Sequence, residues 1–281
     1  MFKIIDKYHF SDKVVSFEVE APRIAASRKP GNFVILRVDE KGERIPLTIA
    51  GANKHKGTIR LVSQTMGVST QKLSKLEIGD SILDLVGPLG KATHVEKVGT
   101  VLACGGGVGV APLLPIVQAF KEAGNRVVSV LAARSRDLII LEEEMRRWSD
   151  ELIIMTDDGS YGKKGLITAG AEEVINSEKI DECIAIGPGV MMKYTALLTK
   201  KYNIPTQASL NSIMVDGTGM CGACRVTVGG KTMFTCVDGP EFDAHDINFD
   251  ELLSRLGGYT KEEHLALEAY QQSTLKEGYT A

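Results

Sequence analysis

Three of the five cysteines of this 281-residue chain lie in one glycine-rich segment, residues 215–236. Within it, one acid and three thiols follow the pattern D-x4-C-x2-C-x11-C. Plant-type 2Fe-2S sites use C-x4-C-x2-C followed by a distant fourth cysteine, so this is their spacing with an acid at the first position. The pattern predicts four ligands of a 2Fe-2S cluster: Asp216, Cys221, Cys224 and Cys236.

The same segment has features that would let it wrap a cluster. Glycines at 217, 219 and 222 allow backbone N–H groups to point at sulfur, and such bonds tune a cluster's reduction potential. The stretch RVTVGGKTMFTC predicts a hairpin turned at Gly229-Gly230, which would return Cys236 to the loop. A structural zinc site is the alternative, because zinc also accepts mixed thiolate and carboxylate ligands.

A second candidate site lies in TVLACGGGVGVAPLLPIVQAF, residues 100–120, which predicts a buried strand, a glycine turn and a helix start. Glycines there allow the backbone to turn sharply and approach a pyrophosphate, and the exposed N–H groups of a helix start favour an anion. The motif is not the full G-x-G-x-x-G, because Val110 occupies the last glycine position. A plain strand-to-helix turn is the alternative. The candidate nucleotide contacts here are Gly105, Gly107, Gly109 and Pro112.

Two later segments would lie at the same edge of a parallel sheet. Asp157 and Asp158 close the apolar stretch ELIIMTDD, where carboxylates could accept hydrogen bonds from a ribose and repel a 2′-phosphate. This favours NAD(H) over NADP(H), although Arg134 and Arg136 argue weakly the other way, and the two acids could simply cap a turn. A further loop that opens a helix contributes Gly187, Pro188 and Met191.

Two segments of the N-terminal region could hold a flavin. In Arg44-Ile45-Pro46-Leu47-Thr48, a cation and a hydroxyl flank a proline on one strand face, where Arg could hold a diphosphate and Thr could reach a ring edge. A strand with a surface Arg is the alternative. Before the helix-like QKLSKL, a second group offers N–H and hydroxyl donors, or a plain helix cap: Gly67, Val68, Ser69 and Thr70.

The elements that must position these residues change along the chain. Residues 1–96 alternate short strands with turns, as in a β-barrel, and the clearest strands span 14–22, 32–40, 44–51 and 58–65. Residues 97–205 alternate apolar runs with helix-like segments, which predicts an α/β domain with a parallel sheet. Residues 206–248 form the cysteine-rich segment, and 249–281 predict a helical tail broken at Gly257-Gly258.

Composition excludes several other classes of protein. The net charge of −3 is too small and too mixed to indicate a nucleic-acid or anionic membrane partner. No signal-peptide h-region or membrane-length apolar run is visible, and clustered cysteines fit a reducing cytosol, so a cytoplasmic protein is expected. Cys104 and Cys183 lie in apolar runs and are expected to be inert core residues. His245 is expected to be a turn residue rather than a ligand.

Taken in order, the motifs resemble those of the ferredoxin-NADP reductase superfamily. The residues from Arg44 to Thr48 resemble its R-x-[YP]-[ST] flavin motif, with Leu47 interposed before the hydroxyl. Gly87-Pro88-Leu89-Gly90 resembles the turn that ends its barrel. Residues 105–112 resemble its G-x-G-x-A-P nucleotide loop, and 186–192 its C-G-P-x-x-M stretch, with isoleucine in place of the cysteine.

With the cysteine segment included, the resemblance covers essentially the whole chain. The arrangement is similar to the electron-transfer subunit of dihydroorotate dehydrogenase, which carries FAD and a 2Fe-2S cluster. It is still more similar to the small subunit of NADH-dependent reduced ferredoxin:NADP oxidoreductase, also known as a sulfide dehydrogenase subunit. In that family an aspartate takes the first ligand position, so Asp216 and the long C-terminal tail favour it.

This resemblance implies a redox subunit in which hydride passes between NAD(H) and FAD, and single electrons pass to or from a 2Fe-2S cluster. It implies a larger iron-sulfur flavoprotein partner that carries its own FAD, 4Fe-4S clusters and the NADP(H) site, reaches ferredoxin, and bifurcates electrons with this subunit. The chain itself offers no site for a second organic substrate, and no residue is assigned to acid–base catalysis. The alternatives are a dihydroorotate dehydrogenase subunit and, in another class, a non-catalytic flavin or nucleotide sensor with a structural metal.

Overall fold

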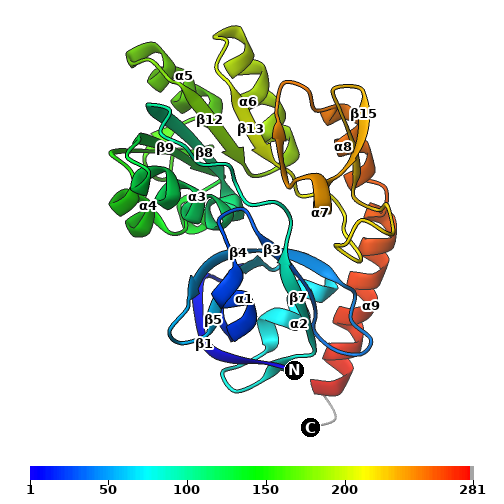
Figure 1. Cartoon of the computed structure of the whole chain (residues 1–281). Helices are drawn as coiled ribbons and strands as arrows, with labels where there is room; N and C mark the ends of the chain where they lie inside the picture. The colour runs from blue at the N-terminus through cyan, green and yellow to red at the C-terminus, as the bar shows by residue number, and fades with distance from the viewer. Residues whose placement is uncertain (279–281) are drawn as a thin grey trace.

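The computed structural model describes residues 1–278, with side chains described up to residue 273. Within this range the chain folds into a β-barrel, a parallel sheet flanked by helices, and a small hairpin segment followed by two helices (Figure 1). The expected fold class is therefore confirmed. No helix among the described residues is both long and apolar enough to cross a membrane.

The barrel is a seven-stranded antiparallel sheet in the order β6-β1-β2-β5-β4-β3-β7. Alternating side chains point inward, and Phe17, Leu61 and Leu36 are fully buried in its core. The four strands expected from sequence are β2 to β5, while β1, β6 and β7 complete the wall. The elements are β1 (Phe2–Ser11), β2 (Val14–Glu20), α1 (Pro22–Ser27), β3 (Phe33–Arg37), β4 (Ile45–Asn53), β5 (Thr58–Gln64), α2 (Val68–Lys75), β6 (Ser81–Ile82) and β7 (Asp84–Leu89).

The second sheet has the order β11-β10-β9-β8-β12-β13-β16, and all neighbours are parallel except β13 and β16. Its elements are β8 (Thr100–Gly106), η1 (Gly107–Gly109), α3 (Val110–Glu122), β9 (Arg126–Ala133), η2 (Arg136–Leu138), α4 (Glu142–Trp148), β10 (Glu151–Thr156), β11 (Lys163–Lys164), α5 (Ile167–Ser177), β12 (Glu182–Ile186), α6 (Gly189–Lys201), β13 (Thr206–Ser209) and β16 (Glu241–Asp243). Two of these strands lie beyond residue 205, so the sheet continues past the predicted domain boundary.

Helices cover both faces of this sheet, as its strand composition predicts. On β8, Val101 and Ala103 pack with α3 and α4, whereas Leu102 and Cys104 pack with α5 and α6. The chain order reverses between β8 and β12, which is where ligands bind in open sheets of this kind. The carboxyl ends of these two strands carry the two glycine loops.

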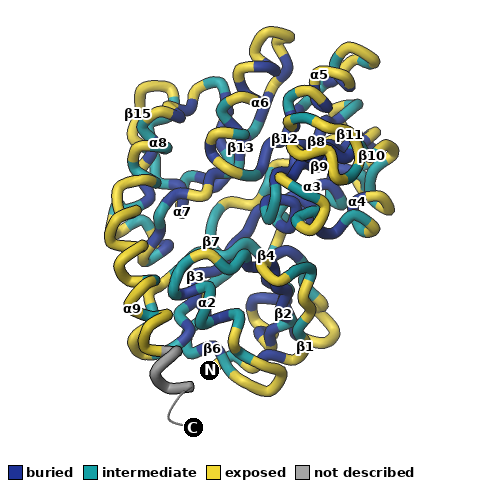
Figure 2. The backbone as a smooth tube through the Cα atoms, turned by 180° about the vertical axis from the view of Figure 1, so that it is seen from behind, coloured by how far each residue is buried: buried dark blue, intermediate teal, exposed yellow. Residues whose placement is uncertain are grey.

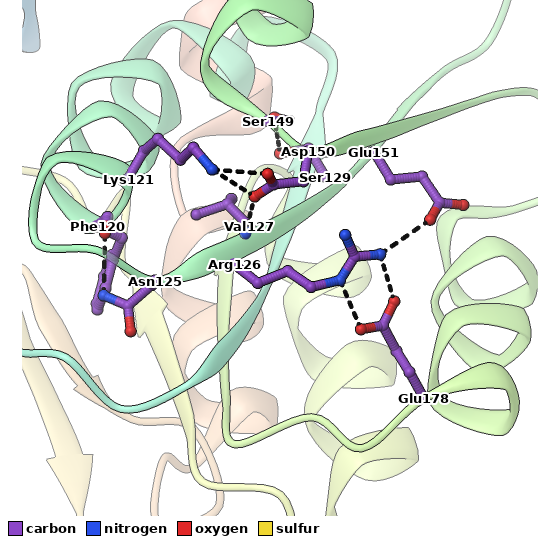
Figure 3. Close-up of polar contacts among 10 residues, drawn as sticks. All are labelled: Phe120, Lys121, Asn125, Arg126, Val127, Ser129, Ser149, Asp150, Glu151 and Glu178. Carbon is purple, nitrogen blue, oxygen red and sulfur yellow. Dashed lines mark hydrogen bonds and ion pairs between the residues drawn. The ribbon is translucent and has the colours of Figure 1, made fainter.

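A polar network fastens the opposite, amino-terminal edge of the sheet (Figure 3). Arg126 donates to Glu178 at 2.8 Å and pairs with Glu151 at 3.3 Å, while Lys121 pairs with Asp150 at 2.6 Å. The Glu178 carboxylate raises the pKa of Arg126. These ion pairs join α3, β9, β10 and α5 at the end remote from the glycine loops, which indicates a structural role.

The barrel packs against the carboxyl edge of the parallel sheet. Val14, Ala50 and Val62 of the barrel share one buried cluster with Val110 and Leu114 of α3. The 3-10 turns η1 and η2, which follow β8 and β9, contact β5 and β1 respectively. The carboxyl edge of the sheet, which carries the two glycine loops, therefore faces the barrel.

The rest of the chain consists of a hairpin segment and two helices. Gly229 and Gly230 turn the hairpin with φ values of +55° and +75°, as expected for a two-residue turn. The helical tail breaks at Gly257-Gly258, which confirms that prediction. Helix α9 runs beside α2 and is mostly exposed (Figure 2). The elements are β14 (Arg225–Val228), β15 (Lys231–Phe234), α7 (Thr235–Asp238), α8 (Phe249–Leu256) and α9 (Thr260–Gly278).

Candidate functional site

The loop before β14 is shaped by an acid and three left-handed glycines. Asp216 accepts hydrogen bonds from the backbone N–H groups of Thr218 at 2.8 Å and Cys221 at 2.7 Å. These bonds, that from Thr218 foremost, lower the pKa of the Asp216 carboxyl. Gly217, Gly219 and Gly222 have φ values of +73°, +86° and +68°, which β-carbon-bearing residues disfavour. The side chain of Asp216 therefore holds the loop in a closed turn.

The three cysteines of the loop differ in their surroundings. Cys224 and Cys236 are buried, and their Sγ atoms lie 3.2 Å apart across the base of the hairpin. Burial, together with the Cys224 thiol, raises the pKa of Cys236 to about 12. Cys221 is exposed at the tip, where its Sγ accepts from the N–H of Ala223 at 3.5 Å. A buried thiol with a raised pKa becomes a thiolate readily only when a metal compensates for the charge.

This donor set fits a two-iron cluster better than a single zinc ion. A structural zinc needs four ligands around one ion. The donors instead form two pairs: Cys224 beside Cys236, and Cys221 linked to Asp216 through its backbone. A 2Fe-2S cluster takes two protein ligands on each iron, so paired donors suit it.

Strand β4 presents the candidate flavin residues on alternate faces. Pro46 and Thr48 lie opposite Ile35 and Phe33 of β3, whereas Leu47 lies opposite Val34 and packs against the barrel core. Only the backbone of Leu47 is thus available on the side of Pro46 and Thr48. Arg44, just before the strand, is exposed. No described carboxylate forms an ion pair with Arg44, so its guanidinium is available for an anionic ligand.

The second candidate flavin group forms the start of α2. Gly67 is the N-cap, and the Thr70 hydroxyl accepts from its N–H at 3.1 Å and donates to its carbonyl at 3.0 Å. Thr70 therefore serves as a helix cap, which was the alternative reading of this motif. The first-turn N–H groups of Val68 and Ser69 are still unpaired within the helix by its geometry. A β-carbon on Gly67 would meet no atom within 4 Å, so the helix start is open to a ligand.

The two glycine loops of the parallel sheet lie against each other. A β-carbon on Gly109 would lie 2.6 Å from the carbonyl oxygen of Ile186 and 2.7 Å from the Cα of Gly187. The Met191 side chain covers Gly106 and Gly187, and Pro188 caps α6. Gly107 has φ +53° and open space beside it. Gly105 lies in β8 and Pro112 in the first turn of α3, as expected. The fold thus joins two sequence-distant loops into one backbone cradle.

The two acids after β10 have different roles. Asp158 accepts from the N–H of Ser160 at 2.9 Å, and its bonds with Ser160 lower the pKa of its carboxyl. It therefore caps the turn, as one alternative anticipated. Asp157 is exposed, and no described side chain or N–H bonds to its carboxylate. An open pocket at this edge is lined by Phe10, Ser135, Arg136, Asp137, Ile139, Asp158 and Ser160.

Several residues lie outside the site. Cys104 and Cys183 are fully buried on neighbouring strands, and the pKa of Cys183 is raised by its contact with Cys104 and by burial, as expected for inert thiols. His245 lies 3.1 Å from the hydroxyl of Thr199, away from the cysteine loop. Sequence reasoning missed Phe33 and Ile35, which share one buried cluster with Cys224 and Cys236. They look like ordinary apolar strand residues, so only strand register could have revealed them.

Family models match two parts of this arrangement. Residues 103–196 match an oxidoreductase NAD-binding domain. Residues 211–248 match the iron-sulfur cluster binding domain of dihydroorotate dehydrogenase B. The two matches coincide with the glycine cradle and with the cysteine loop.

Whole-chain comparisons extend these matches. The chain is 46% identical over 268 residues to a dihydroorotate dehydrogenase B (NAD(+)) electron transfer subunit homolog of Thermotoga maritima, covering 95% of each protein. It is 32% identical to the electron transfer subunit of that enzyme in Streptococcus mutans, over 84% of this chain and 97% of that protein.

Among solved structures, the chain resembles a chain in the structure of the NADH-dependent reduced ferredoxin-NADP oxidoreductase, a structure described as giving insights into flavin-based electron bifurcation. The two are 44% identical with a TM-score of 0.92, over 96% of this chain and 98% of the other. A cytochrome b5 reductase domain, at 18% identity and a TM-score of 0.59, shares the fold alone. Together these findings show that the chain belongs to the family of NAD-linked, flavin and iron-sulfur electron-transfer subunits of oxidoreductases represented by dihydroorotate dehydrogenase B.

Proposed function

We propose that this chain is the small subunit of a heterodimeric, electron-bifurcating NADH-dependent ferredoxin:NADP oxidoreductase. The observation that carries the proposal is that the barrel, with its β4 motif, packs both against the domain that bears the glycine cradle and against the cysteine loop. A flavin on the barrel would then lie near both sites, which suits a carrier that takes electrons from NADH and passes them to the iron-sulfur group. The 44% identity to a solved oxidoreductase of this kind, and the acid at position 216, support the same choice.

In this proposal the glycine cradle binds the pyrophosphate of NAD(H). Backbone N–H groups at the start of α3 face the anion, and Gly107 and Gly109 allow close approach. Asp157, whose carboxylate is free to accept hydrogen bonds, holds the ribose hydroxyls and disfavours a 2′-phosphate. Replacing Asp157 with Asn is expected to narrow the preference for NADH over NADPH, measured as the ratio of the two kcat/KM values.

The barrel residues bind FAD. Arg44 and the N–H groups at the start of α2 neutralise its diphosphate, and the Thr48 hydroxyl bonds to the ring edge. The ion pair between Lys72 of α2 and Asp39, at 2.8 Å, holds the helix start beside the loop that carries Arg44. Bound FAD would couple the two-electron chemistry of NAD(H) to one-electron exchange with the iron-sulfur group. Cys221, Cys224, Cys236 and Asp216 hold that group.

The proposal also requires a larger partner subunit that carries FAD, 4Fe-4S clusters and the NADP(H) site and that reacts with ferredoxin. The decisive experiment is purification of the native complex, with identification of the partner and assay of its flavin and iron. We expect NADH, reduced ferredoxin and NADP to react only in a coupled stoichiometry. A partner without flavin and iron would overturn the bifurcating assignment.

The second candidate function is the electron-transfer subunit of an NAD-dependent dihydroorotate dehydrogenase. It is favoured by the 46% identity to a homolog of that subunit and by the match of residues 211–248. In that case the chain would co-purify with an FMN-containing barrel subunit, and the complex would reduce NAD with dihydroorotate. A sensor without electron transfer would fail to pass electrons from NADH to an artificial acceptor.

A further inference from the structure

The barrel face that bears the candidate flavin residues also bears two buried apolar side chains. In the β3–β4 ladder, Phe33 lies directly opposite Thr48, and Ile35 directly opposite Pro46. Directly opposed residues of an antiparallel pair point to the same side of the sheet, with β-carbons about 5 Å apart. Val34, between them, points to the barrel interior, where it is fully buried.

The cysteine loop covers this part of the outer barrel face. Phe33 and Ile35 form one buried cluster with Met214, Cys224 and Cys236. They are 3% and 1% exposed although they point away from the barrel core, because the loop lies on them. Pro46 and Thr48, one strand away, stay half-buried. The face is therefore divided into a part sealed by the cysteine loop and a neighbouring part that a planar ring could cover.

One close contact fixes the loop on the strand. A β-carbon on Gly217 would lie 2.8 Å from Cγ1 of Ile35 and 2.6 Å from Cδ1 of Leu89. Gly217 directly follows Asp216, so the position of this candidate ligand depends on the side chain of Ile35. On the other side, Phe33 packs in the same cluster as the paired thiols of Cys224 and Cys236.

We propose that Phe33 and Ile35 are positioning residues that form a dry contact between the flavin face of β4 and the cysteine loop, and so set the separation between the two redox groups. This inference rests on the proposed function of the two sites. Oxidation of one NADH releases two electrons, a proton and NAD+. The cluster would accept one electron at a time, with one ferric ion becoming ferrous, so the second electron would cross only after the first has passed on to the partner subunit. Both side chains exclude water and supply packed atoms between the flavin face of β4 and the cysteine loop.

The test uses the full chain, loaded with flavin and iron, and compares truncations on the two faces of one strand. Phe33→Ala and Ile35→Ala remove outward side chains, and Val34→Ala is the matched control that removes an inward one. Flavin and iron contents are measured first. The rate at which the cluster absorbance bleaches after NADH is mixed with the protein, and the electron paramagnetic resonance spectrum of the reduced cluster, are then recorded.

In the outward variants we expect cluster reduction to slow about tenfold or more at unchanged flavin reduction, because small displacements of reacting groups have large effects on rate. The cluster spectrum should change as water reaches the sulfurs, and Phe33→Leu should restore most of the rate. Val34→Ala should lower thermal stability and leave both readouts as in the wild type. If the alanine variants fail to fold, Ile35→Val provides the same comparison at smaller amplitude.

Failure of this inference is distinguishable from failure of the proposed function. If the wild type holds both groups and all variants match it in rate and spectrum, the positioning role is wrong and the function stands. If Val34→Ala slows cluster reduction as much as Phe33→Ala, the effect is general loosening and the inference is overturned. A wild type that binds no flavin or no iron would overturn both.

Discussion

At the scale of single residues, Asp216 combines two roles that one substitution can separate. Its carboxylate caps the loop through the N–H groups of Thr218 and Cys221, and we propose that it is also the first cluster ligand. Asp216→Cys replaces an oxygen ligand with sulfur, so we expect a 2Fe-2S cluster that still assembles with an altered reduction potential. Spectroscopic redox titration measures this. Unchanged iron content together with an unchanged potential would rule out Asp216 as a ligand.

The cysteines allow a matched comparison between a thiol proposed as a cluster ligand and a thiol of the protein core. Cys236→Ala should abolish the visible absorption and most of the bound iron, because it removes one of the paired thiols at the hairpin base. Cys104→Ala, at an equally buried position in the sheet, should keep the full iron content and cost only about 1–2 kcal/mol of stability. Iron assay and thermal unfolding provide the two measurements. Retention of iron in the Cys236 variant would contradict the ligand assignment.

At the scale of elements, the contact between the two glycine loops predicts that Gly109 tolerates no side chain, whereas Gly107 does. Gly109→Ala would place a β-carbon against the carbonyl of Ile186, a backbone atom that cannot move without shifting β12. We expect overpacking of about 2–3 kcal/mol and an increase of about tenfold or more in the KM for NADH. Gly107→Ala meets open space and should cost only about 1 kcal/mol for its positive φ. If Gly109→Ala and Gly107→Ala had equal effects on stability and on the KM for NADH, the proposed nucleotide site between the two glycine loops would be wrong.

At the scale of the whole molecule, one half-buried acid lies where three parts of the chain meet. Glu241 of β16 accepts a hydrogen bond at 3.0 Å from Thr93, in the segment between the barrel and the parallel sheet. A β-carbon on Gly31 of the barrel would lie 3.0 Å from the same Glu241 oxygen. Burial raises the pKa of Glu241 to about 7 from an ordinary value of 4.5. The junction therefore contains a carboxyl whose ionised form is disfavoured.

This shift predicts a pH dependence of stability with a definite sign. Below about pH 4.5, Glu241 is protonated in both the folded and the unfolded chain, so it does not lower the free energy of unfolding. Between about pH 4.5 and 7 it ionises in the unfolded chain but stays protonated in the folded protein. The free energy of unfolding therefore falls as pH rises through this window, by at most about 3 kcal/mol in total once the pH is above about 7. Glu241→Gln should flatten the dependence of unfolding free energy on pH across this window. The exposed Glu43→Gln is the control, and an unchanged slope in Glu241→Gln would contradict the shift.

The sequence by itself determined the local chemistry and the order of the parts. Turn-separated strands predicted a barrel, apolar runs alternating with helices predicted a parallel sheet, and the spacing from Asp216 to Cys236 predicted the cluster ligands. These signals are local, because glycine conformations, strand alternation and ligand spacing depend only on residues that are close together in the sequence. The helix break at Gly257-Gly258 and the Gly229-Gly230 turn were predictable for the same reason.

Only the tertiary structure decided which distant segments meet. Strand register placed Phe33 opposite Thr48 and beneath the cysteine loop, and sheet order placed Gly109 against Gly187. The tertiary structure also showed that Asp158 and Thr70 cap a turn and a helix, whereas the carboxylate of Asp157 makes no such bond with any described residue. The sequence alone allowed either capping or ligand binding for these residues. Register and packing depend on contacts between residues far apart in the chain, and a shift of one residue reverses every side chain, so no local pattern could specify them.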